Sequence, residues 1–326
     1  MISQLLMILA GFILLVWGAD QFVGAAAKTA RKLGVSTLIV GVVIVGLGTS
    51  APEMLVSAIA AVDNHPYLGI GNAIGSNITN LALVLGTTAI LAPLTVHSRV
   101  LWREFPLLIT FTALAYLLLF DGQFARIDGI LLLLGLVGLM YWLIHLARTT
   151  ERSDPFLSEA QAEGESEASN DTSLYRAAIT LVISLAVLLL GSRLLVSGAS
   201  NLATMMGVSD LVIGLSIVAI GTSLPELAAT IAAVRKQEDD MAIGNILGSN
   251  MFNILGVLGL AGAIAPSAIE RTILWRDFPA MFAVTLGVFA IIWHPGEPHR
   301  LRRWHGVILV LIFAAYQILL FDAHAS

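Results

Sequence analysis

The sequence predicts an all-α polytopic membrane protein of about ten transmembrane helices, arranged as two inverted repeats of five helices each. Three observations indicate this fold class: the composition, the length of the apolar runs and an internal repeat. Hydrophobic residues make up 57% of the 326 positions and charged residues 12%, which lies outside the range of soluble domains. Because such a chain cannot hide its apolar surface in one soluble core, we expect it to lie in a bilayer.

Ten apolar runs are long enough to cross a hydrocarbon core of roughly 30 Å. The runs cover residues 3–26, 36–62, 67–93, 104–120, 127–147, 174–198, 208–234, 241–266, 278–293 and 304–321. The first run lacks a cationic start and a small-residue cleavage site, so we expect it to be retained as a span. Lys and Arg gather at the odd-numbered connections, and the positive-inside rule then places those connections in the cytoplasm and both termini outside it.

The long polar segment 148–173 separates the two predicted repeats, which cover residues 1–147 and 174–326. Its seven acidic residues stand among Ser, Ala and Gly, a composition typical of a solvated linker. We expect a cytoplasmic tether, with calcium sensing by the acidic residues as the alternative. The chain has no cysteine, which excludes disulfides and thiolate metal sites.

The internal repeat relates positions that are 173 residues apart. Residues 34–53 and 207–226 are identical at 12 of 20 positions without a gap, and the motif Gly48–Glu53 recurs as Gly221–Glu226. The paired Gly-Asn and Gly-Ser-Asn motifs that follow recur as well, so the repeated motif regions span 48–80 and 221–253. Five spans per repeat is an odd number, so the second repeat enters the membrane from the opposite side. Such inverted repeats place a substrate site near the bilayer midplane.

Each repeated motif places a proline, two hydroxyls and a carboxylate inside an apolar run. Pro52 cannot donate a backbone hydrogen bond, so we expect the helix to kink or break there and to free carbonyls at residues 45–48. Helical spacing sets Thr49, Glu53 and Ser57 in one row. The second repeat has the matching row of Thr222, Glu226 and Thr230.

Glu53 and Glu226 are costly in a membrane, since a carboxylate at the bilayer centre costs on the order of 2.5–3.5 kcal/mol. Apart from Arg176 at the very start of span six, the one arginine within a predicted span is Arg193, in the outer part of span six, and its repeat counterpart is Asp20 near the opposite face. No Lys or Arg lies near either motif in sequence. We therefore expect the two glutamates to hold a cation, with inert protonated glutamates as the alternative.

The candidate ligands in and after the motifs are all oxygens. They are the carboxylates of Glu53 and Glu226, the hydroxyls of Thr49, Ser50, Thr222 and Ser223, and the amides of Asn80 and Asn253. Two carboxylates with carbonyls and hydroxyls suit hard ions and can supply the six to eight oxygens that calcium takes. The same oxygens can hold sodium, whereas soft metals fit poorly. Ser76 and Ser249 precede the two asparagines by four residues, and the alternative role for these serines is close helix packing.

These paired motifs, GTSAPE with GTSLPE and GNAIGSNITN with GNILGSNMFN, resemble the two alpha-repeats of the calcium/cation antiporter superfamily, and specifically its sodium/calcium exchanger family. The resemblance implies a ten-helix fold in which eight short spans hold the site while the first and sixth helices slide. It implies as ligands Thr49, Ser50, Glu53, Ser76, Asn80, Thr222, Ser223, Glu226, Ser249 and Asn253. Some relatives carry Asp at the position of Asn253 and use potassium, so Asn253 favours exchange without potassium.

The resemblance implies sodium/calcium antiport by a prokaryotic member, because the linker is too short for the regulatory domains of animal exchangers. Proton-coupled calcium exchange is the alternative, and a channel or membrane scaffold is a more distant one. We expect no cofactor and no enzymatic activity, since no nucleophile with a base or phosphate-binding loop is evident. The expected partners are lipid and the transported calcium and sodium ions, without nucleic acid or an obligatory protein partner. The expected location is a bacterial inner membrane.

Overall fold

The computed structural model describes residues 1–96, 100–150, 174–207, 219–293 and 299–325. Within these ranges nine helices are long and apolar enough to cross a membrane, so the predicted all-α membrane fold is confirmed. They match nine of the ten predicted runs. Part of the remaining run, 208–218, and most of the predicted linker, 151–173, lie outside the described residues.

The first half begins with the long helix α1 and continues through helices that alternate with π-helical segments, labelled η. Its elements are α1 (Ile2–Leu33), α2 (Thr37–Val40), η1 (Gly41–Gly46), α3 (Leu47–Val62), α4 (Pro66–Ile78), η2 (Thr79–Val84), α5 (Leu85–Leu91), β1 (Leu94–Val96), η3 (Val100–Glu104), α6 (Phe105–Leu119), β2 (Gln123–Phe124) and α7 (Arg126–Thr150).

The second half follows the same order of elements wherever it is described, except that two helices, α11 and α12, stand in the place of α3. Its elements are α9 (Leu174–Met205), α11 (Ala219–Thr222), α12 (Leu224–Arg235), α13 (Asp239–Phe252), η5 (Asn253–Leu258), α14 (Gly259–Ile264), β3 (Ser267–Ala268), η6 (Ile273–Asp277), α15 (Phe278–Ile292), β4 (His299–Leu301) and α16 (Arg303–Ala325). The helix α6 and its counterpart α15 have bounds that differ by the repeat offset of 173. The glycines Gly34 and Gly207, which follow α1 and α9, both adopt positive φ angles of 65° and 83°, as helix-terminating glycines do.

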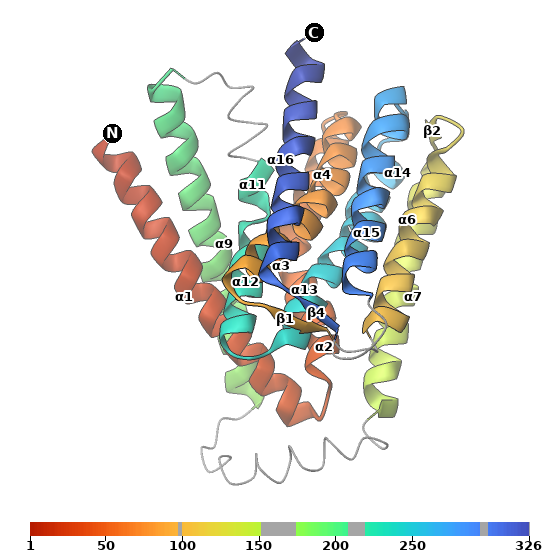
Figure 1. Cartoon of the computed structure of the whole chain (residues 1–326). Coiled ribbons are helices and arrows are strands. Elements are labelled where there is room, and N and C mark those ends of the chain that lie inside the picture. The colour runs from red at the N-terminus through yellow and green to blue at the C-terminus, as the bar shows by residue number, and fades with distance from the viewer. Residues whose placement is uncertain (97–99, 151–173, 208–218, 294–298, 326) are drawn as a thin grey trace.

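Two short antiparallel ladders join the halves reciprocally. β1 pairs with β4, and β2 pairs with β3, so each ladder takes one strand from each half. The ladders lie at opposite ends of the bundle, and the two termini lie at the same end as β2 (Figure 1). This is the arrangement that two inverted halves would produce. The placement of the termini outside the cytoplasm stays a prediction.

The long helices α1 and α9 pack against each other over most of their length and stand to one side of the other helices (Figure 1). Glycines make this contact close. A Cβ atom at Gly11 would lie 2.5 Å from the backbone nitrogen of Leu195, and one at Gly191 would meet the backbone nitrogen of Leu15. Backbone contact of this kind makes α1 and α9 a single packed unit.

The sequence predicts a kink or a break at Pro52, and the structure shows no break there. Helix α3 runs on through Pro52, and the irregular backbone lies upstream, in the π-helical segment η1. In the second half the helix is interrupted at Ser223, between α11 and α12, just before Pro225. Membrane helices tolerate proline where neighbouring groups satisfy the freed carbonyls.

Candidate cation site

Glu53 in α3 and Glu226 in α12 lie in the interior of the bundle, with only 2% and 1% of their surface exposed. Their carboxyl groups are close enough to repel each other. Among the described residues no Lys or Arg forms an ion pair with either one. Two buried carboxylates without a protein counter-charge require a proton or a cation.

The hydroxyl of Thr49 ties the two halves together beside the glutamates. Its Oγ1 lies 3.1 Å from the carbonyl oxygen of Val45, 3.2 Å from Oδ1 of Asn245 and 3.3 Å from Oγ of Ser249. Ser249 in turn donates to the carbonyl of Gly46 at 3.4 Å. The carbonyls expected to be free for an ion are thus partly occupied by hydroxyls of the predicted ligand set.

Glu226 lies near the hydroxyls of Thr49 and Ser50 from the opposite half but forms no hydrogen bond of ordinary geometry with either. The two asparagines approach in the same reciprocal manner. Asn80 lies in η2, which packs against α12, and Asn253 begins η5, which packs against α3. Each half therefore brings its amide toward the helix that carries the other half's glutamate.

Seven oxygen atoms of the predicted ligands are buried without a hydrogen-bond partner. They are Oγ of Ser50, Oε2 of Glu53, Oδ1 of Asn80, Oγ of Ser223, Oε1 and Oε2 of Glu226, and Oδ1 of Asn253. A buried polar atom left unpaired costs about 1–3 kcal/mol, so a set of this size in one region indicates ligands for an ion. Oxygen donors with two carboxylates are the chemistry that calcium and sodium accept.

Ser76 and Thr222 lie at the edge of this set. Ser76 is buried in α4, and its hydroxyl donates to Oδ1 of Asn72 at 3.4 Å. Thr222 ends α11 and is half-buried, with its side chain beside the cavity described below. All ten predicted residues are thus described, and nine of them are buried.

Two further asparagines brace the glutamates, and the predicted ligand set does not include them. Asn72 donates to the backbone carbonyl of Glu53 at 3.4 Å, and its repeat counterpart Asn245 donates to the backbone carbonyl of Glu226 at 3.2 Å. Asn245 also donates to Oγ1 of Thr230 at 2.9 Å. The signal in the sequence was the repeated Gly-Asn pair, which points to both positions.

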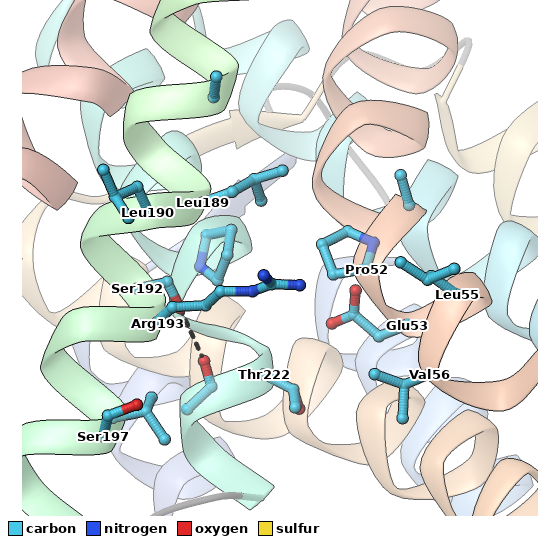
Figure 2. A pocket seen from close by; sticks show the side chains of 15 residues that line it. Pro52, Glu53, Leu55, Val56, Leu189, Leu190, Ser192, Arg193, Ser197 and Thr222 are labelled. Carbon is cyan, nitrogen blue, oxygen red and sulfur yellow. Dashed lines mark hydrogen bonds between the residues drawn. The ribbon is translucent and has the colours of Figure 1, made fainter. Parts of the chain in front are cut away.

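A cavity of about 540 Å³ reaches Glu53 from the space between α9 and α3. Arg193 extends from α9 across this cavity toward Pro52 and Glu53, and Thr222 lies below Arg193 in this view (Figure 2). The hydroxyl of Ser192 donates to the carbonyl of Gly221 at 3.2 Å and joins α9 to α11 along one edge. Arg193, distant from both motifs in sequence, is therefore a cationic side chain beside the site, although it forms no ion pair with Glu53.

Comparison with known proteins shows similarity over nearly the whole chain. The family model described as sodium/calcium exchanger protein matches residues 3–145 and 176–321. The chain is 46% identical to the putative antiporter CaxA of Alkalimonas amylolytica over 323 residues, which are 99% of this chain and 100% of that protein. It is 40% identical to the inner membrane protein YrbG of Escherichia coli over 317 residues, 97% of this chain and 96% of that one.

Similarity extends to an archaeal exchanger and to solved structures. The chain is 30% identical to the sodium/calcium exchanger MaX1 of Methanosarcina acetivorans over a gapped alignment of 345 positions, which covers 97% of this chain and 98% of that one. A structure of the sodium-calcium exchanger NCX_Mj superposes with a TM-score of 0.81 at 31% identity and covers 96% of this chain and 97% of the other. The solved exchanger structure thus shares the fold of nearly the whole chain.

Proposed function

This chain belongs to the sodium/calcium exchanger protein family, and we propose that it exchanges sodium for calcium at the site between Glu53 and Glu226. Membership makes the chain an integral membrane protein of a cation antiporter family, a class of transporters and not of enzymes. The observation that carries the choice of ions is the set of seven buried oxygens without hydrogen-bond partners. Their number and hardness suit calcium, and sodium uses the same donors.

We propose that all ten predicted residues contribute oxygens to the transported ions. The ligands would be Thr49, Ser50, Glu53, Ser76, Asn80, Thr222, Ser223, Glu226, Ser249 and Asn253. Two carboxylates balance one divalent ion, and the same charges with neutral oxygens hold sodium ions instead. Because both cations need the same oxygens, occupancy by one excludes the other, and this competition couples their movements. Asn253 in place of a third acid favours exchange without potassium.

Transport in this proposal requires the site to open to one side at a time. The cavity between α9 and α3 gives one route to Glu53, whereas α1 packs extensively against α12 on the equivalent route toward Glu226. A shift of the packed pair α1 and α9 relative to the other helices would close the first route and open the second. The sodium gradient would then drive calcium out of the cytoplasm.

The proposed location is a bacterial inner membrane, with both termini outside the cytoplasm and the linker 148–173 inside it. The printed name of the relative YrbG, an inner membrane protein, supports the membrane. The distribution of Lys and Arg supports the orientation. Lipid and the transported cations are the partners that this function requires.

The test is uptake of calcium-45 into proteoliposomes that contain the purified chain. Vesicles loaded with sodium and diluted into sodium-free medium should accumulate calcium, and vesicles loaded with potassium should not. A third set with an imposed pH gradient and no sodium separates the proton-coupled alternative, which uses the same carboxylates. Uptake in the third set alone would identify protons, and not sodium, as the coupling ion. Uptake in none of the three sets would refute calcium antiport.

A further inference from the structure

Two charged positions in one half have counterparts of opposite charge in the other half. Asp20 in α1 corresponds to Arg193 in α9, and Lys236 after α12 corresponds to Asp63 after α3. The backbone confirms the second correspondence, because the residues that follow, Asn64 and Gln237, both adopt positive φ angles of 62° and 61°. The pair of Asp20 and Lys236 thus corresponds to the pair of Arg193 and Asp63, with the acidic and basic residues exchanged.

The first set forms an ion pair, which we name the α1 latch. Nζ of Lys236 lies 2.7 Å from Oδ1 of Asp20 and 3.6 Å from the position that a Cβ atom at Gly24 would occupy. A second pair joins Arg31 to Glu238 at 2.8 Å in the same region. Here α1 and α12 are in extensive contact, so the α1 latch lies at a closed interface and stabilises it.

The counterpart set is separated. Arg193 is exposed and extends into the cavity toward Glu53 (Figure 2). Asp63 is exposed at the end of α3 and forms no ion pair with any described residue. Helices α9 and α3 touch only slightly, which is why the cavity exists. The structure therefore has one interface closed with its ion pair formed, and the equivalent interface open with its charges apart.

We infer that Arg193 and Asp63 form the equivalent ion pair, the α9 latch, when α9 closes on α3 and the α1 latch opens. The glycine contacts hold α1 and α9 together, so one movement closes one interface and opens the other. An Arg with an Asp spans about the same distance as a Lys with an Asp. This inference rests on the alternating access of the proposed function, and it makes Arg193 and Asp63 positioning residues that act through α9.

The test measures cavity access without transport. The chain has no cysteine, so a Ser197→Cys variant, at a residue that lines the cavity, carries one reactive thiol. The rate of labelling by the neutral reagent N-ethylmaleimide in detergent reports how open the cavity is. Asp63→Asn should raise the rate and Asp20→Asn should lower it, each by about two- to fivefold, the range of exposed ion pairs.

Charge exchange separates pairing from other effects of substitution. Arg193→Asp alone should act in the same direction as Asp63→Asn, and the double variant Arg193→Asp with Asp63→Arg should restore the original labelling rate. Exposed Glu270→Gln serves as the control and should change nothing. The inference is overturned if Asp63→Asn leaves labelling unchanged or shifts it in the same direction as Asp20→Asn, or if the double variant does not recover while it elutes as a folded protein.

The two proposals fail separately. If wild-type vesicles show no sodium-dependent calcium uptake but the two latch variants shift labelling in opposite directions, the choice of ions is wrong and the α9 latch remains. If wild-type vesicles show sodium-dependent calcium uptake but the two latch variants leave labelling unchanged, the proposed function remains and the α9 latch is wrong.

Discussion

The side-chain amide of Asn245 donates a hydrogen bond to the backbone carbonyl of Glu226 at 3.2 Å. The counterpart Asn72 donates to the backbone carbonyl of Glu53 at 3.4 Å, so each half contains one such hydrogen bond. Both asparagines act on the backbone of a candidate ligand, and neither needs to touch the ion.

Replacing Asn245 by Leu should therefore weaken calcium binding while the ligands stay in place. The substitution leaves the Glu226 carbonyl and the Thr230 hydroxyl without a donor, at a cost of about 1–3 kcal/mol. We expect the KM for calcium in vesicle uptake to rise about tenfold. Asn72→Leu should have a smaller effect because its hydrogen bond is longer, and unchanged KM values in both variants would contradict the bracing role.

Glu53→Gln and Glu226→Gln should each reduce sodium-dependent calcium uptake by about 100-fold. Each substitution keeps the shape of the side chain but removes one of the two charges that balance a divalent ion, a loss on the order of 3 kcal/mol. Initial rates of calcium-45 uptake provide the measurement. Glu270→Gln, at an exposed acid outside the bundle interior, should retain full activity, and activity retained in both site variants would rule out these ligands.

Asn253→Asp should make calcium uptake depend on potassium. The new carboxylate adds a third negative charge to the predicted ligand set, which favours an additional monovalent cation. Uptake measured with and without potassium at constant sodium should differ in the variant and agree in the wild type. Equal rates in the variant would remove the basis for reading Asn253 as a determinant of ion choice.

Gly11→Ala should destabilise the contact between α1 and α9. The new Cβ atom would lie 2.5 Å from the backbone of Leu195, and overpacking of this kind costs about 1–3 kcal/mol. We expect a lower unfolding temperature in detergent. Gly138→Ala in α7, where a Cβ atom meets nothing within 4 Å, is the matched control and should be neutral, so an equal loss in both variants would contradict the role of this contact.

The sequence was sufficient to predict the helices and the burial of both glutamates. Apolar length and the repeat determine where spans lie, and the cost of a membrane carboxylate directs Glu53 and Glu226 to the interior, where the structure has them. That these residues bind the transported ions stays a prediction.

Local backbone geometry was harder to predict. The motif pattern predicts a kink or a break at Pro52, but α3 runs through this residue without a break, whereas the helix of the second half is interrupted at Ser223. The π-helical segments that contain Asn80 and begin at Asn253 have no signature in the residue pattern. Arg193 also reaches the cavity through tertiary packing alone, which spacing along the chain does not reveal.

The reciprocal ladders, β1 with β4 and β2 with β3, have an evolutionary consequence. If the halves were once two identical subunits, both ladders would have been a single self-complementary contact made twice, as in an isologous dimer. Any substitution in such an ancestor would have occurred in both subunits at once, and therefore on both sides of the membrane. Fusion into one chain removed that constraint, and only then could one position become Asp20 in one half and Arg193 in the other.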